Sequence, residues 1–207
     1  MVYELSNLAN DLNVSRETLE KLQTYGDGLL KWQRAKNLVS NSTLDDMWRR
    51  HFLDSAQLAP KLRQVFGDKP LTILDIGSGA GFPGLVLDVM GLGTAHMVES
   101  NGRKCTFMRY VSRETCSSAQ IHAVRVEDLE PFEVDVITSR ACASVSQLLD
   151  WAEPFLENAP EMWLLKGEAA QEELTQAQAC WSITVSRFES LSDPTGSILR
   201  LRDIKRL

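Results

Sequence analysis

The sequence predicts an α/β fold in which a helical N-terminal segment precedes a doubly wound, mostly parallel sheet of seven strands. Three observations support this prediction. The first 66 residues contain no strand-like run, short apolar runs then alternate with helical stretches, and the last two apolar runs have only a turn between them. Because a short turn joins antiparallel neighbours, the sheet should end in an antiparallel hairpin. We expect the helical segment over residues 1–66 and the sheet over residues 67–207.

Two amphipathic helices are expected in the N-terminal segment. Ser15 is a suitable N-cap for the first, in which leucines recur at roughly helical spacing. The second should follow Thr43. Trp32 and Trp48 fall on these helices, where tryptophans usually pack against a core rather than stack on bases.

From Leu71 onward, short apolar runs of the kind that form buried parallel strands alternate with helical stretches. The expected strands cover residues 71–77, 95–99, 121–126, 134–139, 162–166, 182–189 and 197–202. The expected helices cover residues 83–90, 102–114, 146–157 and 168–178. The turn SDPTGS separates the last two strands and leaves no room for a helix.

The composition is that of an ordinary globular protein, with 43% hydrophobic and 24% charged residues. No apolar run reaches the roughly 18 residues that a membrane span requires. The N-terminus, MVYELSNLAND, has neither the basic nor the apolar region of a signal peptide. We therefore expect a cytoplasmic protein with no membrane partner, and nothing in the sequence demands more than a monomer.

Four cysteines lie far apart in the chain, without a CxxC pair or a histidine at metal-ligand spacing. This pattern argues against a disulfide framework and against a zinc site. We expect no metal, and reduced, mostly buried thiols at Cys105, Cys116, Cys142 and Cys180.

The formal net charge of −6 hides an asymmetry along the chain. Residues 31–65 contain seven Lys or Arg and three Asp, which is +4, so the rest of the chain sums to −10. A basic segment on an acidic body is typical of a phosphate-binding surface, and equally of a solvated helix face.

The most informative stretch is LDIGSGAGFPG, residues 74–84, which follows the first expected strand. Gly77, Gly79 and Gly81 permit backbone angles and close approaches that a Cβ would forbid. Pro83 suits the first turn of the next helix. The second strand ends at Glu99, 22 residues after Gly77, where nucleotide-binding folds place an acid on a ribose. The alternatives are a tight turn without a ligand and a surface carboxylate.

The loop does not match the other nucleotide motifs. In the dinucleotide pattern G-x-G-x-x-G the third glycine position is Phe82, and GxxxxGK[ST] is absent. The G-x-G-x-G form instead resembles motif I of the class I S-adenosylmethionine-dependent methyltransferases, which have a Rossmann-like sheet with a terminal antiparallel hairpin. In that fold Val126, Glu127 and Asp128 fall where adenine is bound, although Asp128 is equally a loop carboxylate. Arg140 follows the fourth strand, at the edge where open α/β sheets bind ligands.

Several segments together resemble one family, the bacterial small-subunit ribosomal RNA guanine-N7 methyltransferases known as RsmG or GidB. The resemblance covers about residues 20–170. Besides the glycine loop, it rests on KWQRAKNLVS, RRHFLDS, VESNGRKCTFM, VRVEDL, ITSRACAS and LLKGE. The chain departs from the family at Gln33, where members commonly have Asn.

The resemblance implies methyl transfer from S-adenosylmethionine to N7 of one guanine in the 530-loop region of 16S rRNA, guanine 527 in the usual rRNA numbering. The partner would be 16S rRNA or the small ribosomal subunit. Another RNA, a small molecule, or a non-catalytic RNA-binding role on a relic cofactor fold are the alternatives. The cofactor-binding residues would be Gly77, Gly79, Phe82, Glu99, Val126, Glu127 and Arg140.

Guanine N7 carries a lone pair and no proton, so its methylation needs no general base. The chain also lacks the [DN]PP[YFW] motif used on exocyclic amines and the Pro-Cys used on pyrimidine C6. We expect catalysis by positioning, with Arg140 as the catalytic residue that orients guanine or the methionine carboxylate. His96 and His122 fall within expected strands and should be structural.

The expected substrate-binding residues are Asn37, Arg50 and His51 in the basic segment, with Lys166 as a weaker candidate for a phosphate contact. A structural alternative is an ion pair between Arg50 and Asp54, four residues apart on one helix.

Overall fold

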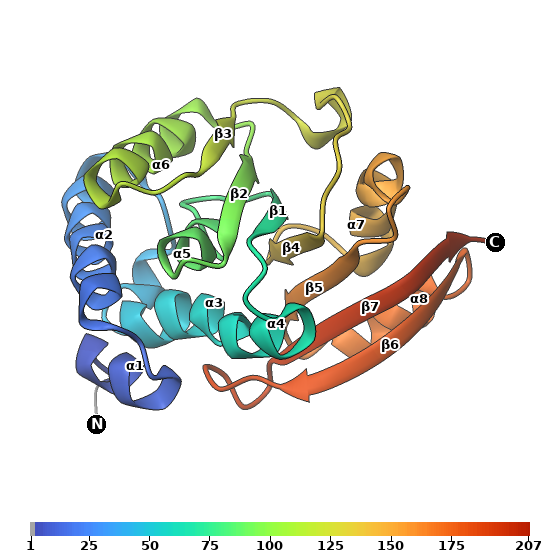
Figure 1. Ribbon diagram of the computed structural model, residues 1–207, viewed down its shortest axis with the longest axis horizontal. Helices are drawn as coiled ribbons and strands as arrows, with labels where there is room; N and C mark the ends of the chain where they lie inside the picture. The colour runs from blue at the N-terminus through green and yellow to red at the C-terminus, as the bar shows by residue number, and fades with distance from the viewer. Residues whose placement is uncertain (1–2) are drawn as a thin grey trace.

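The computed structural model of the protein describes residues 3–207 and contains a seven-stranded sheet with helices on both faces (Figure 1). The strands are ordered β3-β2-β1-β4-β5-β7-β6, and the first five are parallel. β7 runs antiparallel to both β5 and β6, so the terminal hairpin is confirmed. The strands are β1 (Leu71–Ile76), β2 (Gly93–Val98), β3 (Gln120–His122), β4 (Val136–Arg140), β5 (Glu161–Lys166), β6 (Trp181–Glu189) and β7 (Ser197–Arg206).

Helices and helical turns account for most of the remaining chain. The N-terminal ones are α1 (Leu5–Leu12), α2 (Arg16–Lys36), η1 (Asn41–Thr43), the π-helical η2 (Trp48–Leu53), α3 (Asp54–Ala56) and α4 (Leu58–Phe66). Those among the strands are α5 (Gly84–Val89), α6 (Gly102–Thr115), η3 (Val126–Asp128), α7 (Val145–Ala152), η4 (Glu153–Phe155) and α8 (Ala170–Ala177). Ser15 caps α2 as expected, since its Oγ accepts a hydrogen bond from the Thr18 N–H at 3.2 Å.

Each face of the sheet carries its own hydrophobic core, because successive residues of a strand point to opposite faces. Ile73 of β1 belongs to the core formed with α2, α4, α5 and α6, whereas Leu74 belongs to the core formed with α7 and α8. Burying a large apolar side chain contributes about 1.5–3 kcal/mol. The N-terminal helices supply many such side chains, among them Leu22, Tyr25 and Phe52, so apolar packing holds them to the sheet.

Three expectations were inaccurate. β3 ends at His122 instead of continuing to residue 126, because its pairing with β2 stops at Val98 and the chain then turns into η3. The second N-terminal helix is divided into η2, α3 and α4. Of the four cysteines only Cys105 is buried, because the other three fall at helix ends or in turns at the surface.

Other expectations about single residues hold. Trp32 and Trp48 are partly buried and pack against the first core. His96 lies in β2 and His122 in β3, with Nδ1 of the former 3.1 Å from Nε2 of the latter. Within residues 3–207, no helix has the length and apolar character needed to cross a membrane.

Candidate functional site

The glycine loop lies between β1 and α5 and takes up backbone conformations that need glycine. Gly77, Gly79 and Gly81 have φ angles of 70°, 58° and 102°. At Gly77 a Cβ would also lie 2.1 Å from Sγ of Cys142, which follows β4. The loop therefore passes against the end of β4 at a distance that only glycine allows.

Asp75, the penultimate residue of β1, holds the glycine loop in place through hydrogen bonds. Its side chain is fully buried, where Oδ2 accepts a hydrogen bond from the Gly84 N–H at 3.1 Å and Oδ1 accepts one from the Thr138 hydroxyl at 2.8 Å. Burial raises the pKa of Asp75 to about 6, and these hydrogen bonds oppose that rise. The carboxyl thus ties the start of α5 and the middle of β4 to the loop, a role that the sequence pattern had not assigned.

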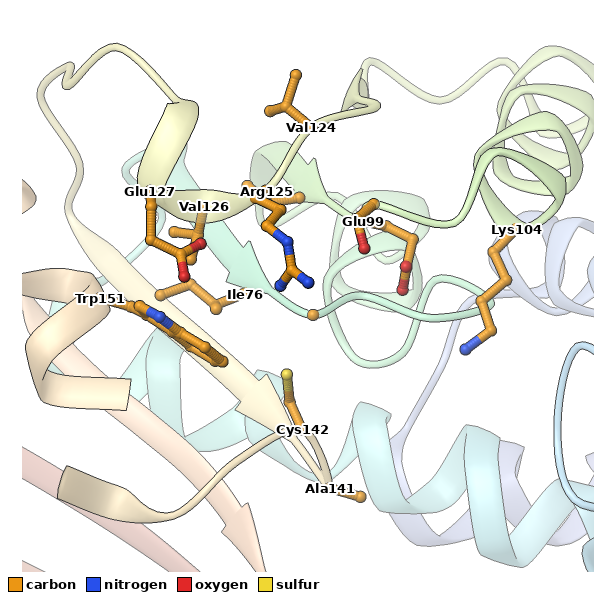
Figure 2. Close-up of a pocket in the computed structure, with 13 residues that line it drawn as sticks. Ile76, Glu99, Lys104, Val124, Arg125, Val126, Glu127, Ala141, Cys142 and Trp151 are labelled. Carbon is orange, nitrogen blue, oxygen red and sulfur yellow. The ribbon is translucent and has the colours of Figure 1, made fainter. Parts of the chain in front are cut away.

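A cavity of about 290 Å³ opens beside the loop at the carboxyl ends of β1, β2 and β4 (Figure 2). Its walls combine the apolar Ile76, Val98, Val126 and Trp151 with the carboxylate of Glu99, and they also include Gly77 and Glu127. Glu99 Oε2 accepts a hydrogen bond from the Gly79 N–H at 2.9 Å, and Oε1 accepts one from the Asn101 N–H at 2.7 Å. We call this space the cofactor cavity.

The residues of the cofactor cavity fit S-adenosylmethionine. The apolar side chains offer a surface for a flat purine, the carboxylate of Glu99 can accept hydrogen bonds from ribose hydroxyls, and Gly77 leaves the loop open to a ligand. Five of the expected cofactor residues thus lie at this cavity, namely Gly77 with Glu99, Val126 and Glu127 as lining residues and Gly79 through its bond to Glu99.

Arg125 and Trp151 are among the lining residues of the cofactor cavity that were not predicted as site residues. The guanidinium of Arg125 projects into the cofactor cavity beside Glu99 (Figure 2). Trp151 reaches it from α7. Arg125 belongs to the VRVEDL segment and directly precedes the predicted cofactor residues Val126 and Glu127, so the sequence offered a signal for it. Trp151 carries no such signal, because its place depends on how α7 packs on the sheet.

A second cavity, of about 480 Å³, lies on the other side of the glycine loop. It shares Gly77, Lys104 and Ala141 with the cofactor cavity. Its further lining residues include several that the sequence predicted, namely Asn37, Arg50, His51, Gly79, Phe82 and Arg140. The fold therefore brings the basic N-terminal segment to the glycine loop. We call this space the substrate cavity.

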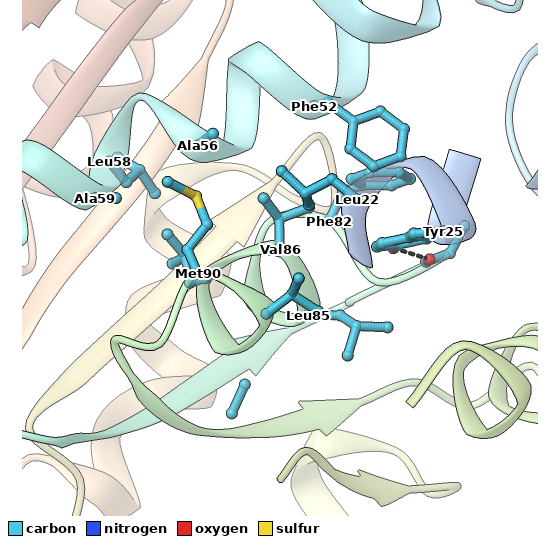
Figure 3. Close-up of a cluster of buried hydrophobic side chains, with 14 of the residues drawn as sticks. Leu22, Tyr25, Phe52, Ala56, Leu58, Ala59, Phe82, Leu85, Val86 and Met90 are labelled. Atoms are coloured by element: carbon cyan, nitrogen blue, oxygen red, sulfur yellow. Dashed lines mark hydrogen bonds between the residues drawn. The ribbon is translucent and has the colours of Figure 1, made fainter. Parts of the chain in front are cut away.

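Phe82 lies at the base of the substrate cavity and is itself almost fully buried. Its ring stacks on that of Tyr25, with centroids 5.2 Å apart (Figure 3). It also stacks on the ring of His51, at 5.1 Å between centroids. The Tyr25 hydroxyl in turn donates a hydrogen bond to the Ala80 carbonyl at 2.6 Å. Phe82 thus anchors the glycine loop in the first core and supports the residues above it.

Arg140, the last residue of β4, lines the substrate cavity and is held by the N-terminal segment. Nη1 donates hydrogen bonds to the Arg50 carbonyl at 2.8 Å and to Asp54 Oδ2 at 3.3 Å, and Nη2 donates one to His51 Nδ1 at 3.0 Å. The guanidinium carbon lies 5.1 Å from the centroid of the Phe82 ring. These bonds use three of the five N–H groups of an arginine, and no other group within residues 3–207 accepts from the remaining two.

His51 lines the substrate cavity, although most of its side chain is buried, and its ring is neutral. Burial and the charges of Arg140 and Arg50 lower the pKa of His51 to about 3. Because arginine has no acceptor, Nδ1 must receive the bond from Arg140, and Nε2 then carries the proton. Nε2 therefore donates to the Thr43 hydroxyl, 2.8 Å away.

Arg50 and Asp54 do not form the ion pair that was considered as an alternative. Arg50 pairs with Asp193 in the turn between β6 and β7 at 2.7 Å, and Asp54 contacts Arg140. Arg50 and Asp54 find partners that are distant in the sequence because η2 lies between that turn and the end of β4.

Lys166 is placed unfavourably for the phosphate contact that was expected of it. Its side chain is only 6% exposed, and Nζ donates hydrogen bonds to Glu173 Oε2 at 2.8 Å and to the Ala143 carbonyl at 2.5 Å. The ammonium group thus pairs with a partly exposed carboxylate and connects β5 to α8.

Gln33, the departure from the family pattern, is almost fully buried and shapes the turn after α2. Oε1 accepts hydrogen bonds from the Leu38 and Val39 N–H groups at 2.8 and 3.0 Å, and Nε2 donates to the Val39 carbonyl and to Asn41 Oδ1. Asn37 adopts the left-handed conformation at the end of α2. Gln33 therefore fixes the turn that forms one wall of the substrate cavity.

Among the described residues, no group of three or more His, Cys, Asp or Glu is arranged to hold a metal ion.

Comparison with known proteins identifies the family. The family described as rRNA small subunit methyltransferase G matches residues 18–198 of this chain. Ribosomal RNA small subunit methyltransferase G of Rhodospirillum rubrum is 49% identical over 198 residues, which cover 96% of each chain. The protein of the same name from Paramagnetospirillum magneticum is 49% identical over 193 residues, covering 93% of this chain and 92% of that one.

Solved structures share the fold at much lower identity. The ribosomal protein L11 methylase from Lactobacillus delbrueckii subsp. bulgaricus superposes with a TM-score of 0.53 at 18% identity, covering 73% of this chain and 78% of that one. The M. jannaschii TYW2 in complex with AdoMet gives 0.54 at 11% identity, covering 74% and 77%. These likenesses show the fold alone and confirm the class I methyltransferase architecture. The sequence matches go further, and they place the chain in the rRNA small subunit methyltransferase G family.

Proposed function

We propose that this S-adenosylmethionine-dependent methyltransferase transfers its methyl group to N7 of guanine 527 in 16S rRNA. The observation that carries the proposal is the junction of two cavities at the glycine loop. The cofactor cavity and the substrate cavity share Gly77, Lys104 and Ala141. A methyl group held at the shared wall is therefore within reach of a base that enters the substrate cavity.

The residues at the junction suit an acceptor that has no proton to lose. When bound, S-adenosylmethionine supplies a methyl group on a positively charged sulfur. Guanine N7 offers a lone pair as an acceptor, so no side chain has to remove a proton. His51 is neutral but engaged at both ring nitrogens, which makes it a holder of Arg140 and not a base. The rate enhancement would come from aligning the two reactants in a dry site.

Arg140 is the group best placed to align them. It borders the substrate cavity with two N–H groups that have no acceptor within residues 3–207, and a guanidinium can donate two parallel hydrogen bonds to one planar acceptor. The methionine carboxylate is such an acceptor, and guanine O6 can accept one of these hydrogen bonds while the N7 lone pair stays free to attack the methyl group. Asn37 and Arg50 line the same cavity and would contact the nucleotide around the base.

RNA phosphates have a matching surface next to the substrate cavity. α2 and α6 pack together through Trp32, whose ring lies 5.8 Å from that of Phe107 and 5.2 Å from that of Tyr110. This packing places the end of α2 beside the start of α6, and Asn37 and Lys104 meet at the substrate cavity. Five basic residues lie on these two helix ends, and within residues 3–207 none of them forms an ion pair: Lys31, Arg34, Lys36, Arg103 and Lys104. We call them the basic strip.

The proposal also covers the cellular setting. The substrate would be 16S rRNA or the small ribosomal subunit, and the enzyme would act as a cytoplasmic monomer. The helical residues 1–66 would form most of the RNA-binding side, and residues 67–207 the cofactor-binding side.

The experiment is methyl transfer from labelled S-adenosylmethionine to small subunits that lack the modification. We expect one methyl group per 16S rRNA and none on 23S rRNA. A 16S transcript in which 7-deazaguanine replaces guanine should accept none, because it lacks the acceptor nitrogen. Equal transfer to the 7-deaza transcript would show that another atom is methylated.

A further inference from the structure

We infer that Asp54 is a positioning residue, which acts with the turn between β6 and β7 to fix the Arg140 guanidinium at the junction of the two cavities. The inference deepens the proposed function and rests on it for its kinetic readout. The geometric claim stands on the contacts of Asp54, Arg140 and the turn.

Asp54 connects Arg140 to the C-terminal hairpin. Its Oδ2 accepts the hydrogen bond from Arg140 Nη1 at 3.3 Å, while Oδ1 accepts bonds from the Ser192 hydroxyl at 2.5 Å and from Gln57 Nε2 at 3.1 Å. The side chains of Asp54 and Arg140 are each 17% exposed. Three donors from three parts of the chain thus set the orientation of one partly buried carboxylate.

The turn is docked by a second, fully buried side chain. Gln57 Oε1 accepts the Leu191 N–H at 2.7 Å, and its Nε2 donates to the Ser190 hydroxyl at 3.1 Å. Asp193, in the same turn, holds the guanidinium of Arg50 at 2.7 Å. Two acidic residues border the 210 Å³ space between the turn and η2, and both are engaged. Asp54 accepts a hydrogen bond from Ser192 of the turn, and Asp193 of the turn pairs with Arg50.

Charge explains why Asp54 matters more than the other acceptors of Arg140. The Arg50 carbonyl and His51 Nδ1 are neutral, so Asp54 is the one anion among the three groups that accept from Arg140. All three bonds have a charged donor, but only the bond to Asp54 also brings two opposite charges together, which adds a Coulomb attraction between two side chains that are each 17% exposed. Without this anion, the Arg140 cation would be held by neutral acceptors alone and would be free to turn away from the substrate cavity that it borders.

The test is a double-mutant cycle on Asp54 and Arg140. Asp54→Asn keeps the size of the side chain and removes its charge. We expect it to lower kcat/KM about 10-fold. If Arg140→Ala changes mainly kcat, Asp54→Asn should also change mainly kcat, and if Arg140→Ala changes mainly a KM, Asp54→Asn should change the same KM. In the Arg140→Ala background, Asp54→Asn should change the rate less than about 2-fold, because it acts only through Arg140. Ser192→Ala should reproduce a smaller part of the Asp54→Asn effect.

The matched control is Glu161→Gln. Glu161 pairs with Arg200 between β5 and β7, with side chains that are 15% and 20% exposed, but it does not touch Arg140. Glu161→Gln should lower the melting temperature about as much as Asp54→Asn does, and it should leave kcat/KM unchanged. Additive effects of Asp54→Asn and Arg140→Ala, or an equal loss of rate in Glu161→Gln, would overturn the inference.

A substrate-free readout separates this inference from the proposed function. The nitrogen chemical shifts of the His51 ring report the bond that Nδ1 accepts from Arg140. Asp54→Asn should change them in the protein alone, and Glu161→Gln should not. If the wild-type protein fails to methylate 16S rRNA but the shifts change in this way, the substrate is wrong and the positioning role stands. Unchanged shifts in Asp54→Asn would reject the positioning role itself.

Discussion

Nη2 of Arg140, at the end of β4, donates a hydrogen bond to Nδ1 of His51 on the π-helical turn at 3.0 Å, although the two residues are 89 positions apart in the sequence. This bond joins the basic N-terminal segment to the carboxyl edge of the sheet. It also keeps the imidazole in one tautomer, with its proton on Nε2. A π-helical turn often marks a functional site, and here it presents the Arg50 carbonyl and the His51 ring to one guanidinium.

We predict that His51 stays neutral throughout the physiological range. Burial and two neighbouring arginines lower its pKa to about 3, so its ring signals should not titrate between pH 8 and pH 5 in NMR spectra. Since an unfolded histidine has a pKa of about 6.5, the unfolded state binds more protons between these values. The stability that His51 contributes is therefore complete above pH 6.5 and is lost as the pH falls toward 3. His51→Asn should lose less stability than the wild type between pH 7 and pH 5, and a titration midpoint near 6.5 would contradict the assignment.

Gly77→Ala should weaken cofactor binding by at least about 10-fold. The new Cβ would overlap Cys142 Sγ, and the φ angle of 70° costs a residue with a side chain about 1–2 kcal/mol. Binding of S-adenosylhomocysteine by calorimetry measures the effect. Gly91→Ala is the matched control, because Gly91 has a φ angle of 76° and no atom within 4 Å of the added Cβ. It should carry the same backbone cost without loss of affinity, and an equal loss in both variants would point to stability alone.

Arg140→Lys should reduce kcat/KM about 10- to 100-fold although it keeps the positive charge. A lysine ammonium cannot reproduce the three bonds to Arg50, His51 and Asp54 and still present two parallel N–H groups. The loss of charge-assisted bonds sets the magnitude. Single-turnover kinetics with saturating cofactor measure the chemical step. Near-normal rates in Arg140→Lys would mean that only the charge of Arg140 is used.

The basic strip should control the salt dependence of RNA binding. Lys36→Ala and Arg103→Ala each remove one expected phosphate contact, so each should reduce the slope of log K against log salt by about 0.7–0.9. Affinity for 16S rRNA fragments between low and moderate salt provides the slope. Lys205→Ala, on the exposed C-terminal part of β7, removes the same charge away from the site and should leave the slope unchanged. If Lys36→Ala and Arg103→Ala kept the same salt slope as Lys205→Ala and the wild type, the basic strip would be excluded from the RNA interface.

The sequence pattern could predict most of the fold because local signals were strong. Ser15 marked the start of α2, and the glycine loop and the SDPTGS turn marked where strands ended. The π-helical turn was missed because its apolar residues fit an ordinary helix equally well. β3 was drawn too long because Val126 is apolar and buried, although it sits in a turn.

The candidate site was predictable where a residue follows a strand, and less so where long-range contacts decide. Glu99 and Arg140 come directly at the ends of strands, so the position of each followed from the order of the elements. The burial of His51 and the ion pair of Lys166 with Glu173 depend on packing between distant segments. The roles of Asp54 and Gln33 likewise required the partners that the fold brings to them.

The measurement that tests the central claim most directly is mapping of N7-methylguanine in the 530 loop of 16S rRNA from cells that lack the modification. Borohydride and aniline treatment cleaves the RNA at N7-methylguanine, and primer extension locates the break. Cells supplied with the wild-type protein should show cleavage at guanine 527, and cells supplied with Arg140→Ala at the same level should show little or none. An unmodified guanine 527 in the presence of the folded wild-type protein would contradict the account.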